Sequence, residues 1–271
     1  MDTLIKKIKQ KEVILFVGAG VSATLNLPTW SQLMDYIAGE LGMDKEVFKM
    51  YGDNLELAEY YYHKKGTIGD LRSWLDRSWN IDDNIIKEST IFRNICRLKF
   101  PIIYTTNYDY CLERAHDINN KKYNKIVKVE DLCNINNDYT QIIKFHGDFA
   151  DDNSIVLTES SYFNRMDFES PLDIKLRADI LGKSILFIGY SLSDINMRYL
   201  IYKLNKLWDL SDNEHNRPKS YIFLGSPNPV QELIWERRNI TPIIGEEINS
   251  QLSLEKFLNN LAEGVETGYG Y

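Results

Sequence analysis

Short runs of apolar residues recur along the chain, and most of them end in glycine or in polar side chains. An apolar run of this kind, bounded by turn residues, is typical of a strand buried on both faces of a parallel sheet. The pattern predicts five buried strands and one edge strand. They are Val13–Val17, Pro101–Asp109, Gln141–Gly147, Ser184–Asp194, Ser220–Gly225 and, at the edge, Thr241–Ile244.

Between these strands, apolar residues recur every three or four positions, which is the spacing of an amphipathic helix. Ser31 is predicted to cap a helix that continues to Leu41. The segment from residue 44 to about residue 100 keeps helical periodicity throughout and is predicted to be an insertion between two strands. Later helices are predicted at Ile174–Leu181, Met197–Leu207, Val230–Arg238 and Leu252–Leu261.

Strands that alternate with helices indicate an α/β fold, here a Rossmann-like, doubly wound parallel sheet with a helical insertion at about 44–100. The 271 residues, 44% of them apolar, suffice for one large domain with a real core. We therefore expect a single domain over residues 1–271.

The charge and the cysteines narrow the function classes. A net charge of −7 gives no electrostatic reason to expect direct nucleic-acid binding. No apolar run approaches the roughly 20 residues of a membrane span, and no signal-peptide core precedes the first strand, so we expect a cytoplasmic protein without membrane contact. The three cysteines, widely spaced at Cys96, Cys111 and Cys133, predict neither a disulfide framework nor a metal site.

A glycine turn follows the first strand. Gly18 and Gly20 lack a Cβ, so the backbone can turn with positive φ and a ligand can approach it closely. Ser22 and the amides beyond it are placed to face an anion at the start of the next helix. The turn therefore predicts a phosphate-binding loop.

Polar groups also follow three other strands, and ligands of open α/β sheets bind outside the carboxyl ends of the strands. We therefore expect one crevice to hold all four groups. They are Gly18, Gly20 and Ser22; Thr105, Thr106, Asn107 and Asp109; His146 and Gly147; and Gly189, Ser191 and Ser193 or Asp194.

The order Gly-Ala-Gly-x-Ser, Thr-x-Asn-x-Asp, His-Gly and Gly-x-Ser-Leu resembles the sirtuin family over residues 13 to about 245. The resemblance implies NAD as the ligand and cleavage of its nicotinamide–ribose bond. By position, it implies that Asn107 and Asp109 face the nicotinamide and ribose and that His146 is the catalytic base. It implies NAD contacts by Gly18, Ala19, Gly20 and Ser22 at the pyrophosphate, Gly189 and Ser191 at phosphate and adenine ribose, and Thr106 and Ser226 elsewhere along the cofactor.

The chain also departs from the sirtuin deacetylases. These enzymes carry two Cys-x-x-Cys pairs for a structural zinc after their histidine, whereas no cysteine follows His146 here. Thr29-Trp30-Ser31 replaces their Asp-Phe-Arg segment, and Thr106 replaces their glutamine. The chain thus looks like the zinc-free bacterial branch that hydrolyses NAD in anti-phage defence.

The resulting hypothesis is an NAD hydrolase that releases nicotinamide and ADP-ribose and depletes NAD during infection. Loss of nicotinamide leaves an oxocarbenium-like sugar, for which an amide can orient water and a histidine can accept a proton. The alternatives are a non-catalytic sensor or assembly subunit that binds NAD or ADP-ribose, and a zinc-free protein deacylase. The resemblance implies a homo-oligomer and a partner such as a HerA-like hexameric ATPase. The trigger, cyclisation of the product and the role of Asp194 stay open.

Overall fold

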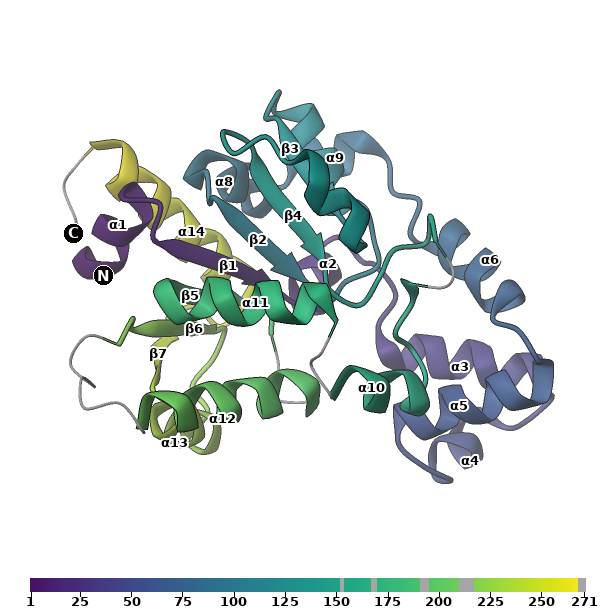
Figure 1. Cartoon of the computed structure of the whole chain (residues 1–271). Helices are drawn as coiled ribbons and strands as arrows, with labels where there is room; N and C mark the ends of the chain where they lie inside the picture. Colours follow the sequence, from purple (N-terminus) through teal and green to yellow (C-terminus); the bar gives the residue numbers. More distant parts are fainter. Residues whose placement is uncertain (152–153, 167–169, 191–194, 210–216, 268–271) are drawn as a thin grey trace.

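The computed structural model describes residues 1–151, 154–166, 170–190, 195–209 and 217–267. Seven parallel strands form one sheet in the order β3-β4-β2-β1-β5-β6-β7 (Figure 1). The strands are β1 (Val13–Val17), β2 (Ile102–Thr105), β3 (Tyr123–Ile126), β4 (Thr140–Lys144), β5 (Ser184–Ile188), β6 (Ser220–Leu224) and β7 (Ile240–Ile244). The predicted α/β architecture is confirmed, and all six predicted strands are present: β1 has the predicted bounds, β7 begins one residue earlier, and the other four are shorter than predicted.

Helices cover both faces of the sheet and form a layer on each. Alternate residues of a central strand point to opposite faces and pack against the two layers in turn. In β1, Val13, Leu15 and Val17 belong to one hydrophobic cluster and Ile14 and Phe16 to the other. The first layer contains α1 (Asp2–Lys9), α2 (Ala19–Ala23), α7 (Asp83–Glu88), α8 (Thr90–Leu98), α9 (Cys111–Ile118) and α14 (Ser250–Thr267). The second contains α11 (Pro171–Gly182), α12 (Ile195–Asp209) and α13 (Pro229–Arg237).

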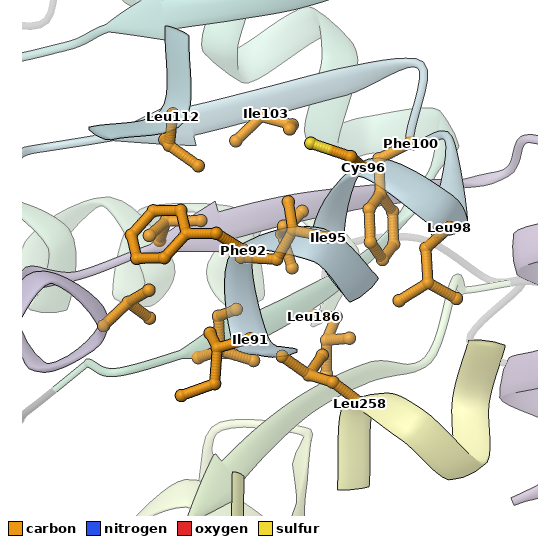
Figure 2. Packing of buried hydrophobic residues seen from close by; sticks show 14 of the residues in the cluster. Ile91, Phe92, Ile95, Cys96, Leu98, Phe100, Ile103, Leu112, Leu186 and Leu258 are labelled. Carbon is orange, nitrogen blue, oxygen red and sulfur yellow. The ribbon is translucent and has the colours of Figure 1, made fainter. Parts of the chain in front are cut away.

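The first layer is centred on α8. Its apolar side chains Ile91, Phe92 and Ile95 point towards β2, β5 and α14, where they meet Ile103, Leu186 and Leu258 (Figure 2). Burial of one such side chain contributes about 1.5–3 kcal/mol to folding. The α8 helix is therefore an integral part of the sheet's core.

A third hydrophobic cluster lies beyond the carboxyl ends of the strands (Figure 1). It joins four helices to two aromatic residues of the strand-end loops, Tyr108 and Phe149. The helices are α3 (Trp30–Glu40), α4 (Lys45–Lys49), α5 (Asn54–Lys65) and α6 (Gly69–Ser78), which we call the helical module. The module thus begins before residue 44, whereas α7 and α8, inside the predicted 44–100 insertion, pack in the sheet layer.

Three local features differ from the sequence prediction. Thr29, not Ser31, caps α3, because its hydroxyl accepts from the Gln32 amide while the Gln32 side chain accepts from the Thr29 amide. Strand β3 was not predicted, because only Ile126 of its four residues is fully buried. The last helix continues to Thr267. The short η1 (Val129–Asn134) and α10 (Glu159–Met166) complete the described elements.

A buried histidine makes stability depend on pH. His116 of α9 is 2% exposed and its Nδ1 lies 2.8 Å from the Leu112 carbonyl oxygen; burial lowers the pKa of this histidine. The unfolded chain then binds the proton more readily, so stability falls as pH drops below the ordinary value of about 6.5. We expect His116→Leu to remove about 1 kcal/mol of the stability lost between pH 7.5 and 5.5, measured by urea unfolding at both pH values.

The control is His63→Leu, because the His63 side chain is 70% exposed. This variant should keep the wild-type pH dependence. If the free energy of unfolding of wild type and of His116→Leu changed equally with pH, His116 would be protonated as easily in the native protein as in the unfolded chain.

Candidate active site

The glycine turn after β1 packs against the end of β5, where the chain order reverses within the sheet. Such a switch point is where open α/β sheets bind ligands. The Gly18 amide donates to the Ile188 carbonyl oxygen at 3.0 Å, and the Gly20 amide donates to that of Gly189 at 2.9 Å. A Cβ on Gly20 would lie 2.9 Å from the Gly189 oxygen. Gly18 and Gly20 are therefore required by close packing and not by a positive φ. Of the three glycines at this contact, only Gly189 has a positive φ, of +60°.

Asn107 connects the glycine turn to the end of β2. Its Nδ2 donates to the Gly18 carbonyl oxygen at 3.2 Å and to Ser22 Oγ at 3.0 Å. A carbonyl oxygen can only accept, so these bonds fix which end of the Asn107 amide is nitrogen. The other end, Oδ1, is buried without a hydrogen-bond partner in the described residues. A buried acceptor left unpaired costs about 1–3 kcal/mol, and a donor that reached this oxygen would remove that cost.

Thr105 holds Asn107 in place. Its hydroxyl donates to the Val17 carbonyl oxygen at 2.9 Å and accepts from the Asn107 amide at 3.0 Å. Thr105 is 1% exposed and does not reach the cavity, whereas its neighbour Thr106 lines it. The last residue of β2 thereby ties the β1 and β2 loops together.

His146 follows β4 and lies at the same edge, with 2% of its surface exposed. Its Nδ1 is 3.4 Å from the hydroxyl of Tyr162 on α10, and the two rings meet edge to face at 5.0 Å. Gly147 has φ of +93° and lets the chain turn immediately after the histidine. Tyr162 was not predicted, because nothing in the sequence places α10 beside this edge.

The β2 loop rests on a buried ammonium group. Lys144 of β4 is 1% exposed, and its Nζ donates to the backbone oxygens of Tyr108, at 3.2 Å, and of Asp109. Its carboxylate neighbours are Glu113 at 3.4 Å and Asp148 at 3.8 Å. The Asp109 side chain accepts from the Cys111 amide at 3.0 Å, at the start of α9. Lys144 therefore holds the backbone of the loop that carries Asn107.

A cavity of about 1090 Å³ lies at this carboxyl edge of the sheet. Asn107, Asp109, His146 and Ser22 are buried at its wall, and Ala19, Gly20 and Ser226 are exposed there. The helical module contributes the apolar side chains Trp30, Leu33, Leu75 and Trp79, and the opposite part contains Ser226, Asn228, Gln231, Ser250 and Gln251. The volume is at the upper end for small-molecule sites and suits an elongated ligand.

The structure brings most of the predicted residues together, but Thr105 and Gly147, which were expected in the same crevice, do not line the cavity. Gly18, Ala19, Gly20, Ser22, Thr106, Asn107, Asp109, His146, Gly189 and Ser226 all line the cavity. Ser191, Ser193 and Asp194 lie outside the described residues. In the described part of the chain, no group of three or more histidine, cysteine or acidic side chains is placed to hold a metal ion. None of its helices is long and apolar enough to cross a membrane.

Comparison with known proteins adds relatives in sequence and in fold. A family model described as SIR2-like domain matches residues 101–243. The chain is 25% identical over 212 residues to NAD(+) hydrolase ThsA of Bacillus cereus (strain MSX-D12), covering 78% of this chain and 43% of that protein. It is 29% identical over 214 residues to the ThsA of Enterococcus faecium, covering 76% and 42%.

A third relative is defense-associated sirtuin 2 of Bacillus subtilis, 29% identical over 225 residues, which cover 81% of this chain and 21% of that protein. The chain therefore spans less than half of the length of these curated relatives. Among solved structures, the crystal structure of a Sir2 homologue–NAD complex aligns with a TM-score of 0.56 at 13% identity, covering 99% of this chain and 94% of that one. This likeness supports the fold.

Proposed function

The chain belongs to the SIR2-like domain family, and from this premise we propose that it is an NAD hydrolase. NAD binds in the cavity at the carboxyl edge of the sheet, and the bond between nicotinamide and ribose is cleaved to give nicotinamide and ADP-ribose. The relatives named NAD(+) hydrolase ThsA support this reaction. The relative named defense-associated sirtuin 2 supports a role in defence, which we propose is the depletion of NAD during phage infection.

The observation that carries the proposal is the Asn107 side chain. Both its donor interactions are with the glycine turn, and its buried Oδ1 has no partner among the described residues. A ribose hydroxyl or a water molecule can donate to this oxygen, which fixes the sugar or the nucleophile beside His146. Orientation of this kind is a large part of what an enzyme supplies.

The chemistry divides among the residues of one edge. The exposed backbone of Ala19 and Gly20 lies where the pyrophosphate passes, and Ser226 lies towards the adenosine. When nicotinamide leaves with the electron pair of the bond, the ribose becomes an oxocarbenium-like cation. The Asp109 carboxylate, at the cavity wall, stabilises this positive charge. Water then attacks the sugar carbon, and His146 accepts its proton.

The direct test is to incubate the purified protein with NAD and to measure nicotinamide release. We expect Asn107→Ala to lower the rate about 10²- to 10³-fold, the usual loss on removing one positioned polar group. Asn84→Ala on α7 is the matched control, because Asn84 is exposed and does not line the cavity. Intact NAD after incubation with the wild-type protein, alone and with cell extract from its host, would reject the proposal.

A further inference from the structure

A second cavity, of about 600 Å³, lies between α12 and α13. Four of its eight lining residues are cationic, and none is acidic. The eight residues are Ile195, Arg198, Tyr199, Tyr202, Asn205, Lys206, Arg237 and Arg238. In a chain whose net charge is −7, such a concentration of positive charge in one hollow is unexpected.

The positive charges of this cavity are not compensated by the described part of the protein. Arg198 and Arg238 form no ion pair there, and Arg198 Nε and Arg238 Nη1 are buried without a hydrogen-bond acceptor. Burial and the neighbouring charge of Arg198 lower the pKa of Arg238. An unsatisfied buried donor is costly, and more so when it is charged. An anion that accepts from both guanidinium groups would remove this cost.

Two tyrosines lie on α12 beside the cations. Tyr199 and Tyr202 are three positions apart, are 37% and 57% exposed, and stack with their ring centroids 6.5 Å apart. The Lys203 ammonium group lies 4.8 Å from the centroid of the Tyr199 ring, so the more exposed ring of Tyr202 is the one suited to stacking on a planar ring that carries phosphate groups.

Contacts between α12 and the end of α13 hold the wall of this cavity together. Asn205 of α12 donates through Nδ2 to the backbone oxygen of Arg238 at 3.0 Å, and Arg217 donates to Asn205 Oδ1. The Arg238 guanidinium also lies 5.7 Å from the centroid of the Trp235 ring, which is almost fully buried. These contacts hold α12 and α13 at a fixed separation, so the arginines are presented from rigid elements.

We propose that this cavity, which adjoins the first cavity at Ile195, is a second site, which binds a small nucleotide through its phosphate groups. Arg198 and Arg238 hold the phosphates as bidentate donors, Lys206 and Arg237 add charge at the rim, and the base stacks on Tyr202. The small volume of the hollow and the confinement of the positive charge to it favour a small nucleotide over a nucleic-acid strand, which tracks along an extended basic groove.

The experiment is a calorimetric titration of the full chain with ADP and with inorganic pyrophosphate. The test variant is Arg198→Gln/Arg238→Gln, and the control is Lys6→Gln/Lys9→Gln, which changes the net charge equally at exposed residues of α1 on the other face of the sheet. We expect both probes to bind the wild type and the control with equal affinity and the test variant at least 10-fold more weakly. Thermal unfolding monitors the fold of each variant.

Three results would overturn the proposal. Equal ADP affinity in wild type and test variant would place the probe in the first cavity. An equal loss in test variant and control would reduce the effect to net charge. A thymidine decamer that binds Arg198 and Arg238 more tightly than ADP does would assign the site to a nucleic-acid backbone. Because the readout is binding, the outcome is independent of whether the first cavity cleaves NAD.

Discussion

Replacement of His146 by alanine is expected to lower the rate of NAD cleavage by about 10²- to 10⁴-fold, the usual contribution of a general base. The imidazole is 2% exposed, lines the same cavity as Asn107, and has Tyr162 on its Nδ1 side. A buried, oriented ring that can take a proton from water is lost in this variant. Nicotinamide release at saturating NAD is the measurement.

Two further variants separate proton transfer from structure. His146→Gln keeps a polar side chain of similar size but cannot accept the proton, so it should be as impaired as His146→Ala. Tyr162→Phe removes only the hydroxyl near Nδ1 and should cause a much smaller loss, since Tyr162 positions the ring. Near-wild-type activity of His146→Gln would rule out the role of His146 as a base. His63→Ala, on the exposed surface of α5, is the matched histidine control.

Replacement of Lys144 by methionine is expected to lower the free energy of unfolding by about 3–5 kcal/mol, as is usual when one partner of a buried ion pair is removed. The variant leaves Glu113 buried without its ammonium partner and leaves the carbonyl oxygens of Tyr108 and Asp109 without their donor, whereas Asp148 keeps its ion pair with Lys125 at 2.7 Å. Burial already raises the pKa of Glu113 despite the nearby ammonium group. Urea unfolding gives the loss directly.

The matched control is Lys65→Met, because Lys65 pairs with Glu40 at 3.2 Å on the surface. Exposed pairs of this kind contribute at most about 1 kcal/mol. Adding Glu113→Gln to Lys144→Met should recover part of the loss, since one uncompensated carboxylate disappears. If Lys144→Met were no less stable than Lys65→Met, the buried network would have no role in supporting the β2 loop.

The sequence predicted the sheet well, because a strand buried on both faces leaves an uninterrupted apolar run such as Val13–Val17. Strand β3 left no such run, since it lies at the sheet edge and only Ile126 is fully buried. The limits of the helical module also escaped prediction. Helical periodicity shows that a segment has an apolar face but not which neighbour covers it, so α8 could not be distinguished from α5.

For the site, the sequence identified the residues but not their connections. Polar residues at strand ends share one edge by topology alone, which is why Asn107 and His146 were predicted to meet. The bonds from Asn107 to Gly18 and Ser22, and the contact of Tyr162 with His146, depend on side-chain geometry. Lys144 was missed for another reason. A lysine at the end of a strand is usually exposed to solvent, whereas here its ammonium group is buried between the carboxylates of Glu113 and Asp148.

The bonds of Gly18 and Gly20 to the end of β5 continue the hydrogen-bonded ladder of β1 beyond the last residue of the strand. The turn is consequently anchored to the sheet, so a ligand that lies along it need not order it first. The side chains that lose conformational entropy when a ligand binds are then mainly those on the far side of the cavity, where surface helices form the wall. Differences in affinity between homologues of this chain should accordingly arise there, while the turn stays the same.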